Sequence, residues 1–256
     1  MRPVSKPLVL ILGGTGEGAA IARALDGRAR VTSSLAGRTR RPAALAGAVR
    51  TGGFGGAAGL ARYLREQRID RLIDATHPFA ARISAHAREA AERTGVPRLA
   101  VERPMWRRRP GDRWICVADA ADAARALAGL PDALFLTLGP GDLDAFAGLA
   151  NRRLVLRRID PGPSPLAGAA VVLARGPFDL AGERRLFEEY GVRTLVTRAS
   201  GGAATEAKIA AARERNMPVV MIRRPPPEPG PRVSSVEEAV AWALSGALSS
   251  AGSGSS

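Results

Sequence analysis

Cysteine is nearly absent from this sequence, since Cys116 is the single cysteine among 256 residues. One cysteine cannot form an internal disulfide framework or build a metal site by itself, so we expect no metal. No apolar run approaches the roughly 20 residues that a membrane-spanning helix needs. The start of the sequence, MRPVSKPLVLILGG, enters a glycine turn without a secretory cleavage pattern. We therefore expect a cytoplasmic protein that does not enter a membrane.

Aromatic residues are also scarce, at 4% of the sequence, and Tyr63 and Tyr190 are the only tyrosines. So few aromatic rings offer little for base stacking, and no recognition helix or zinc finger is visible, which disfavours a nucleic-acid partner. No Tyr-x-x-x-Lys pair follows the first glycine turn, which argues against an alcohol or sugar dehydrogenase. Positive charge is abundant, with 38 Lys and Arg against 24 Asp and Glu. This balance favours a polyanionic ligand, although a GC-rich coding bias would also enrich arginine.

Strand-like and helix-like segments alternate along the chain, as they do in parallel α/β proteins. We predict strands over residues 8–12, 30–35, 71–75, 98–102, 133–138, 154–158, 170–174, 194–198 and 218–223. We predict helices over residues 17–26, 57–67, 79–94, 119–128, 142–149, 181–190, 203–215 and 235–248. The tail SSAGSGSS is of low complexity and is expected to be disordered.

The two halves of the sequence resemble each other weakly. YLREQRIDRLIDATHPFA (63–80) and LFEEYGVRTLVTRASGGA (186–203) share their order of helix end, strand and loop. Each continues to a strand that ends in Arg-Pro, and then to an amphipathic helix, at an offset of about 120 residues. Chance likeness between any two α/β units is the alternative. The shared order predicts an α/β protein of two similar Rossmann-like parallel-sheet domains with a cleft between them.

A glycine-dense turn, GGTGEG, follows the first predicted strand. Glycines there allow positive φ angles and let a phosphate approach the backbone N–H groups at a helix start. The spacing Gly-x-Gly-x-x-Ala over residues 14–19 fits the looser dinucleotide fingerprint, whereas a packing turn is the alternative. No Gly-Lys-Ser/Thr follows, so the turn is not a Walker loop. The candidate cofactor-binding residues are Gly13, Gly14, Thr15, Gly16 and Glu17.

The end of the second predicted strand distinguishes the two nicotinamide cofactors. An NAD site usually places an acidic residue there to bind the ribose 2′-hydroxyl, but RVTSSLAGRTRR (30–41) contains no acid. Ser33 and Ser34 supply hydroxyl groups, and Arg38 is the nearest guanidinium. This chemistry suits the 2′-phosphate of NADP(H). A solvated basic loop is the alternative.

Several motifs together resemble the precorrin-6A reductase family. They are, in order, GGTGEG (13–18), SSLAGR (33–38), GGFGG (52–56), DATHPFA (74–80), RGPF (175–178) and SGG (200–202). The resemblance covers about residues 8–245. It implies NADPH-dependent reduction of the C18–C19 double bond of precorrin-6A, which gives precorrin-6B in cobalamin biosynthesis.

The resemblance also implies two α/β domains with cofactor and substrate between them. We therefore expect an NADP-binding Rossmann-like domain over residues 1–130 and a second α/β domain over 131–248 that closes a substrate cleft. Residues 249–256 would form the disordered tail. The substrate would be a tetrapyrrole with several carboxylates, for which an arginine-rich cleft has a physical purpose.

The remaining motifs supply further candidate residues. In GGFGG, the backbone of Gly53, Phe54 and Gly55 is expected to contact the cofactor or macrocycle, with a plain turn as the alternative. Thr76 is expected near the cofactor. His77 is a candidate proton donor or carboxylate ligand, or a structural histidine, next to the substrate-binding candidates Pro78 and Phe79. Pro78 is well placed to start a helix.

The second half contributes candidate groups for the substrate's carboxylates. Arg175, at a strand end, is an expected carboxylate clamp, or else an exposed structural arginine. Ser200, Gly201 and Gly202 are expected to open a helix whose N–H groups receive an anion. Lys208, further along that helix, is expected to be a surface charge.

One motif departs from the family. The family usually has Thr-Lys-Asn before SGG, but here the residues are Thr197, Arg198 and Ala199. Arginine keeps the positive charge but does not readily lose a proton. We therefore favour Arg198 as a holder of a substrate carboxylate over Arg198 as a proton donor.

Two other functions remain open at this point: an NADP-dependent reductase of another small polyanionic substrate, and a non-catalytic NADP-sensing Rossmann protein. The second would use its basic surface on nucleic acid. The sequence does not distinguish a metal-free from a cobalt-containing substrate, and it reveals neither the proton donor nor the oligomeric state.

Overall fold

Two units make up the part of the chain that the computed structural model describes, residues 6–37 and 45–245. One unit comprises Met1–Arg103 with Pro225–Ser256, and the other comprises Pro104–Arg224. The chain thus passes into the second unit after Arg103 and returns after Arg224. Both crossings fall at the Arg-Pro pairs that end the repeated segments.

The first unit is built on a six-stranded parallel sheet of order β12-β5-β4-β1-β2-β3. Strand order reverses at β1, and the carboxyl ends of strands at such a switch point are where open α/β sheets bind ligands. The elements are β1 (Leu8–Leu12), α1 (Gly16–Ala24), β2 (Arg30–Leu35), β3 (Ala48–Thr51), α2 (Gly56–Glu66), β4 (Arg71–Asp74), α3 (Ala81–Thr94), β5 (Arg98–Val101), β12 (Arg232–Val233) and α7 (Val236–Ser245).

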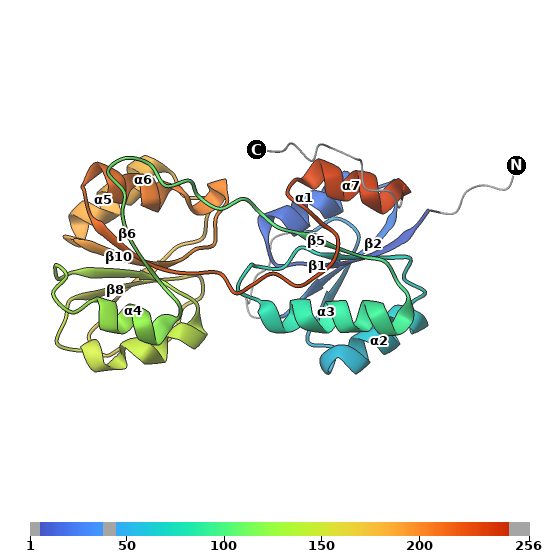
Figure 1. The fold of residues 1–256 in the computed structure, drawn as a ribbon, viewed down its shortest axis with the longest axis horizontal. Coiled ribbons are helices and arrows are strands. Elements are labelled where there is room, and N and C mark those ends of the chain that lie inside the picture. Colours follow the sequence, from blue (N-terminus) through green and yellow to red (C-terminus); the bar gives the residue numbers. More distant parts are fainter. Residues whose placement is uncertain (1–5, 38–44, 246–256) are drawn as a thin grey trace, which may run out of the picture. The chain divides into compact units, whose positions relative to one another are not determined.

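Helices cover both faces of this sheet, α1 and α7 on one face and α2 and α3 on the other (Figure 1). The central strand β1 is apolar at every position because a parallel sheet buries both of its faces. Val9 and Ile11 belong to the core cluster that includes Trp242 of α7. Leu10 and Leu12 belong to the opposite cluster, formed with α2 and α3. The sheet therefore holds the carboxyl end of β1 between two packed layers.

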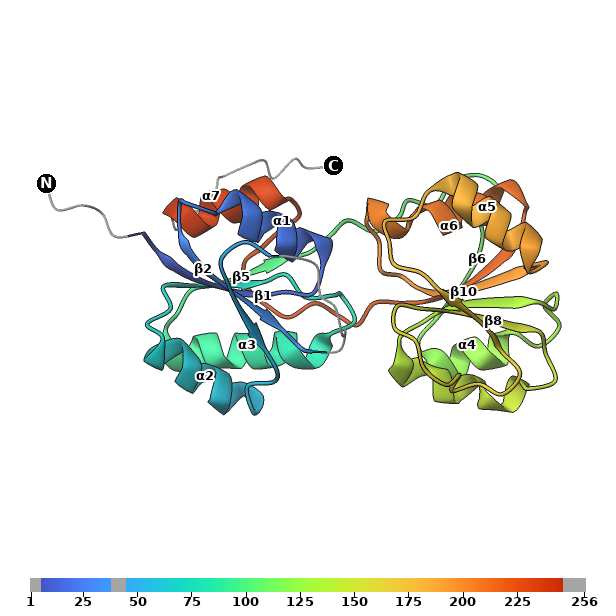
Figure 2. The ribbon, with the colours of Figure 1, turned by 180° about the vertical axis from the view of Figure 1, so that it is seen from behind.

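The second unit has the same construction, with a parallel sheet of order β6-β11-β10-β7-β8-β9. Helices α5 and α6 cover one face, and α4 covers the other together with the 3₁₀ segment η1 (Figure 2). The elements are β6 (Arg113–Val117), α4 (Ala120–Ala126), β7 (Leu134–Thr137), η1 (Pro140–Leu149), β8 (Leu154–Arg158), β9 (Ala170–Leu173), α5 (Leu180–Glu189), β10 (Thr194–Arg198), η2 (Ala203–Thr205), α6 (Ala207–Glu214) and β11 (Pro218–Ile222).

Both sheets follow one strand order, 3-2-1-4-5-6, when the strands of each are numbered by their place in the repeat. In the first sheet β12 is the sixth strand, and in the second sheet β6 is the sixth. The expectation of two similar parallel α/β sheets is therefore confirmed. The nine predicted strands are present, and six of the eight predicted helices are α-helices that begin within two residues of their predicted starts.

The sixth strands are exchanged between the two sequence repeats. Strand β6 and helix α4 follow β5 in the chain but join the second sheet, where β6 pairs with β11. Strand β12 and helix α7 end the described chain but join the first sheet, where β12 pairs with β5. The division expected near residue 130 is therefore replaced by the two crossings. A local pattern predicts a strand, but it does not say which sheet edge that strand joins.

Three edge strands, β3, β6 and β12, lie outside the nine predicted ranges, and none of them has a fully buried position. The predicted helix over 142–149 is a 3₁₀ segment. The predicted tail, 249–256, and the last residues of the final predicted helix lie outside the described residues.

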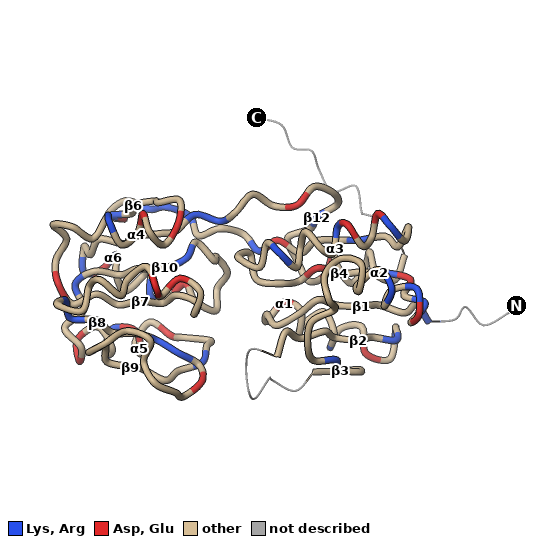
Figure 3. The backbone as a smooth tube through the Cα atoms, turned by 90° about the horizontal axis from the view of Figure 1, so that it is seen from below, with Lys and Arg blue, Asp and Glu red and all other residues tan. Residues whose placement is uncertain are grey.

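Positive and negative residues are mixed along both units (Figure 3). Several arginines form ion pairs within their own unit, such as Arg184 with Glu214 and Arg152 with Asp132. Part of the net positive charge is thus used in local contacts. None of the described helices is long and apolar enough to cross a membrane.

Candidate active site

The loop between β1 and α1 lies at the switch point of the first sheet. Thr15 caps α1, since its Oγ1 accepts a hydrogen bond from the Gly18 N–H at 3.1 Å. The same hydroxyl donates to the Ala75 carbonyl after β4 at 2.6 Å. Gly14 has a φ of +99°, and no atom lies within 4 Å of a Cβ placed there or at Gly16. An anion can therefore approach this backbone without meeting a side chain.

Neighbouring glycines hold the loop close to the sheet. The Gly13 N–H donates to the Ser34 carbonyl at 3.0 Å, so Gly13 positions the loop against β2. A Cβ on Gly18 would lie 3.3 Å from the Gly13 Cα, which explains how α1 packs tightly here. Glu17, in the first turn of α1, accepts a hydrogen bond from Arg103 at 2.6 Å, which balances its charge. Open backbone, close packing and a helix start together fit a dinucleotide pyrophosphate.

The carboxyl end of β2 carries Ser33 and Ser34, both buried. Ser34 Oγ accepts a hydrogen bond from Arg50 Nη1 at 3.2 Å. Ser33 Oγ is buried and has no hydrogen-bond partner in the described part of the chain. The predicted phosphate ligand Arg38 lies outside the described residues. The hydroxyl pair expected at a 2′-phosphate site is therefore present at the end of β2, with a different arginine beside it.

Arg50, on β3, lies beside Ser34 and was not among the candidate residues predicted from the sequence. Its Nη1 donates to the Gly52 carbonyl at 2.7 Å, and its Nη2 donates to the Gly53 carbonyl at 2.8 Å. The guanidinium carbon lies 3.7 Å from the centre of the Phe54 ring. The sequence did not reveal Arg50 because its place beside Ser34 depends on the register between β2 and β3.

The GGFGG segment, with Phe54 at its centre, forms the turn between β3 and α2. Gly52, Gly55 and Gly56 have φ angles of +110°, +77° and +84°. A Cβ on Gly59 would lie 1.7 Å from the Phe54 carbonyl oxygen, so only glycine fits there. The Phe54 ring is half-buried, whereas Gly53 and Gly55 are exposed. Of the three residues predicted to contact the cofactor or macrocycle, Gly53 and Gly55 thus have accessible backbone, whereas the Phe54 ring chiefly packs against Arg50.

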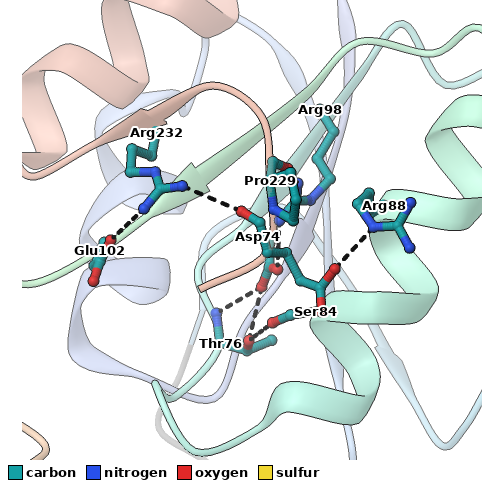
Figure 4. A network of polar contacts seen from close by, with 9 residues as sticks. Asp74, Thr76, Ser84, Arg88, Arg98, Glu102, Pro229 and Arg232 are labelled. Carbon is teal, nitrogen blue, oxygen red and sulfur yellow. Dashed lines mark hydrogen bonds and ion pairs between the residues drawn. The ribbon is translucent and has the colours of Figure 1, made fainter. Parts of the chain in front are cut away.

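Thr76 follows β4 and is bound to a buried carboxylate (Figure 4). Asp74 Oδ1 accepts from the Thr76 hydroxyl at 2.7 Å and from the Thr76 N–H at 3.3 Å. The Thr76 hydroxyl also lies 3.2 Å from Ser84 Oγ on α3. Asp74 pairs with Arg98 at 3.6 Å, and both side chains are buried. Thr76 therefore anchors the loop after β4, and its cofactor contact stays a prediction.

The same network fastens the returning chain to the first unit (Figure 4). Arg98 Nη1 donates to the Pro229 carbonyl at 3.1 Å. Arg88 of α3 pairs with Glu228 at 2.8 Å. These contacts hold the segment before β12 against α3 and β5, so they serve the strand exchange.

His77, Pro78 and Phe79 are half-buried in the turn after β4. His77 Nδ1 accepts a hydrogen bond from the Phe79 N–H at 3.2 Å, so the proton of the neutral ring is on Nε2. Pro78 does not start α3, because the turn closes with the Ala80 N–H donating to the His77 carbonyl and the helix begins at Ala81. Within the described ranges no three His, Cys, Asp or Glu side chains gather as a metal site.

In the second unit Arg198 ends β10 beside the loop after β7. Its Nε donates to Asp142 Oδ2 at 2.5 Å, in the first turn of η1. A Cβ on Gly139 would lie 2.9 Å from Arg198 Nη1, so this glycine makes room for the guanidinium. The loop after β7 is the counterpart of the glycine loop after β1, and the Arg198 guanidinium packs against it. The arrangement suits an arginine that holds an anion rather than one that transfers a proton.

The SGG segment does not open an α-helix, contrary to our expectation. A short 3₁₀ turn, η2, follows it, and α6 begins only at Ala207. The Gly202 N–H donates to the Pro104 carbonyl at 3.3 Å, so it is not available to an anion. Arg224 donates to the Ser200 carbonyl at 2.8 Å, and a Cβ on Gly201 would collide with the Pro104 carbonyl. Ser200, Gly201 and Gly202 are therefore braced by the residues at the two chain crossings.

Arg175 lies just after β9 and is exposed. It makes no hydrogen bond or ion pair with any residue that the structure describes. Phe178, in the same RGPF motif, stacks on Arg157 with the guanidinium carbon 4.0 Å from the ring centre. The position of Arg175 is compatible with a carboxylate clamp, which stays a prediction.

Lys208 is buried, so the expectation of a surface charge was wrong. Its side chain lies in the first turn of α6, with Nζ 5.4 Å from the centre of the Trp106 ring. The pKa of Lys208 is lowered to about 8, chiefly by burial and also by the Arg157 guanidinium, whereas Glu183 acts in the opposite direction. The sequence pattern failed here because α6 is covered on most of its sides, so helical periodicity did not identify an exposed face.

Comparisons with known proteins agree with this geometry. The family described as "Precorrin-6x reductase CbiJ/CobK" matches residues 8–244. A precorrin-6A reductase of Rhodococcus erythropolis is 48% identical over 238 residues, covering 91% of this chain and 96% of the relative. A cobalt-precorrin-6A reductase of Priestia megaterium is 31% identical over 190 residues, covering 70% and 74% of the two chains.

A solved structure resembles the whole fold. The structure titled "CobK precorrin-6A reductase" superposes with a TM-score of 0.86 at 40% sequence identity, covering 92% of this chain and 95% of that one. Sequence and fold thus agree over nearly the full length, and this chain belongs to the precorrin-6x reductase family.

Proposed function

We propose that this reductase uses NADPH to reduce the C18–C19 double bond of precorrin-6A, giving precorrin-6B on the way to cobalamin. The observation that carries the proposal is the open glycine loop at the switch point, beside hydroxyl and guanidinium groups at the ends of β2 and β3. Membership of the family and the names of the relatives supply the substrate.

The first unit would hold the cofactor. Gly14 and Gly16 leave open space at the start of α1, where N–H groups and the helix dipole favour a pyrophosphate, and the backbone of Thr15 between them would also contribute. Gly13 and Glu17 would act indirectly, Gly13 by fixing the loop to β2 and Glu17 through its pair with Arg103. When bound, NADPH supplies the hydride for the reduction.

The nearby loops would orient the cofactor. Ser33, Ser34 and Arg38 are the proposed ligands of the 2′-phosphate. Gly53, whose carbonyl binds Arg50, and Gly55 offer exposed backbone after β3. The unpartnered Ser33 hydroxyl supports this assignment, because a buried hydroxyl without a partner is costly unless a ligand satisfies it.

The second unit would bind the substrate's carboxylates. Arg198, fixed by Asp142, and the exposed Arg175 are the proposed clamps, because guanidinium matches a carboxylate in charge and shape. His77 is the proposed source of the proton that completes the reduction, which it would give up as an imidazolium; the neutral ring that remains can accept the Phe79 N–H at Nδ1. The half-buried Pro78 and Phe79 would exclude water beside it.

We further propose that the substrate is metal-free. The relative named a precorrin-6A reductase is 48% identical, whereas the one named a cobalt-precorrin-6A reductase is 31% identical. The greater similarity supports the metal-free ring.

The test is an assay of the purified protein with metal-free precorrin-6A, cobalt-loaded precorrin-6A, NADPH and NADH. We expect NADPH to be consumed, followed at its near-ultraviolet band, only when the metal-free ring is present. The product should gain two hydrogens by mass spectrometry. Equal rates with NADH, or consumption only with the cobalt-loaded ring, would overturn the corresponding part of the proposal.

A further inference from the structure

We propose that Arg50 determines the specificity for the cofactor. Its guanidinium, together with the Ser34 hydroxyl, binds the 2′-phosphate of NADPH. This inference rests on the proposed function. It assigns a role to a residue of β3 that lies outside both of the motifs SSLAGR and GGFGG.

Strand register places Arg50 at the required edge of the sheet. Leu12 pairs with Ser34 across β1 and β2, and Ser34 pairs with Arg50 across β2 and β3. The three residues therefore lie in one row, one residue before the glycine loop. The adenosine ribose of a dinucleotide lies over the end of the second strand in such a sheet, and neighbouring strands are only about 5 Å apart.

The charge of Arg50 is uncompensated in the described part of the chain. Its guanidinium donates to the Ser34 hydroxyl and to the carbonyls of Gly52 and Gly53, and no described Asp or Glu forms an ion pair with it. In contrast, Arg103 near the glycine loop is paired with Glu17. A half-buried guanidinium without a carboxylate partner is suited to receive an anion from outside.

The guanidinium is also held in one orientation. Two carbonyls bind it from the GGFGG side, and Phe54 stacks on it with the guanidinium carbon 3.7 Å from the ring centre. Tyr63 packs edge-on against Phe54, with ring centres 5.3 Å apart. Little conformational entropy is then lost when the arginine binds a phosphate, which favours both affinity and selectivity.

A purely structural role is the competing explanation, because the same contacts brace the loop. The two roles differ in what they predict for a ligand without the 2′-phosphate. A brace affects adenosine ligands with and without that phosphate alike. A phosphate ligand affects only those that carry it.

The experiment uses isothermal titration calorimetry with adenosine 2′,5′-bisphosphate and adenosine 5′-monophosphate as probes. The proteins are the wild type, Arg50→Met, Arg50→Lys and the control Arg62→Met. Arg62 is an exposed arginine on α2 paired with Glu66, so its replacement removes the same charge away from the site.

We expect the wild type to bind the bisphosphate more tightly than the monophosphate. Arg50→Met should weaken bisphosphate binding about 10- to 100-fold and leave monophosphate binding nearly unchanged. Arg50→Lys, which keeps the charge but not the fork of donors, should fall between these values. Arg62→Met should resemble the wild type.

Loss of affinity for both probes in equal proportion would overturn the inference in favour of a brace, and so would a bisphosphate preference that survives in Arg50→Met. If Arg50→Met does not fold, an unchanged preference in Arg50→Lys overturns the inference and a reduced one supports it. A wild type without any bisphosphate preference would overturn the NADPH proposal itself, which separates the two failures.

Discussion

Arginines that look alike in the sequence differ sharply in their surroundings. Arg157 is half-buried and forms two hydrogen bonds with the buried Glu183, at 2.7 and 2.9 Å. Arg198 donates from Nε to Asp142, whereas Arg50 donates to the Ser34 hydroxyl and to the carbonyls of Gly52 and Gly53. Burial and partners, which depend on tertiary structure, therefore decide which guanidinium groups remain suited to an external anion.

Replacement of Arg198 tests its proposed hold on a substrate carboxylate. We expect Arg198→Met to raise the KM for precorrin-6A about 10- to 100-fold, the effect of losing a charged hydrogen bond, with a smaller change in kcat. Arg198→Lys, which restores the family's usual residue, should recover most of the affinity. Steady-state kinetics measure both constants. A fall in kcat at unchanged KM would contradict the assignment.

The buried Lys208 makes a pH-dependent contribution to stability. Its pKa of about 8 in the folded protein lies below the ordinary 10.5, so the folded state disfavours the charged form by on the order of 3 kcal/mol. Below pH 8 both states carry the charge and the cost is present in full. As pH rises from 8 to 10.5 the folded lysine loses its proton first, so the free energy of unfolding increases.

Lys208→Met should remove this dependence. We expect the variant to unfold at a higher temperature than the wild type at pH 7 and to lack the relative rise between pH 8 and 10, as measured by thermal denaturation. Arg157 from β8, Glu183 from α5 and the ring of Trp106 are the groups near Lys208, and all remain in the variant. Parallel pH profiles in the two proteins would show that another group titrates.

At the scale of elements, the start of α1 could be predicted from the sequence because its glycines and its threonine serve the local geometry of the helix start. Thr15 satisfies an N–H of the first helical turn and also ties the loop to β4. The SGG segment looked similar in sequence, but its glycines serve close packing against Pro104 and Arg224. Glycine thus serves a helix start in the first unit and close backbone packing beside the chain crossings in the second.

Thr15→Val tests the cap with little change in shape. Both hydrogen bonds of the hydroxyl are lost, so we expect the free energy of unfolding to fall by about 1–2 kcal/mol. Urea denaturation measures the change. Thr15→Ser keeps the hydroxyl and should stay close to the wild type. If the serine variant loses as much as the valine variant, the methyl group and not the hydroxyl carries the contribution.

At the scale of the whole molecule, each sheet is completed by a strand from beyond its own continuous repeat. Strand β12 and helix α7 return to the first unit, where Val240 and Trp242 are part of the core cluster with Ile21 and Leu25. A fragment that stops before this return leaves that core open on one side. The exchange therefore couples the ends of the chain to the stability of the first unit.

Fragments of the chain test this coupling. We expect residues 1–103 joined to 225–245 by a flexible linker of about ten residues to unfold cooperatively, as followed by circular dichroism. Residues 1–130, which contain β6 and α4 instead, should lack a cooperative transition. A cooperative transition in 1–130 would mean that β6 and α4 can complete the first sheet as well as β12 and α7 do.

The sequence by itself determined the alternation of strands and helices, the repeat, the glycine loop after β1 and the family resemblance. These depend on local backbone preference and on burial along a single element, which residue patterns express directly. Only the tertiary structure decided which sheet β6 and β12 join, that Arg50 lies beside Ser34, and that Lys208 is buried. Those outcomes depend on pairing and packing between distant segments, for which a local pattern carries no signal.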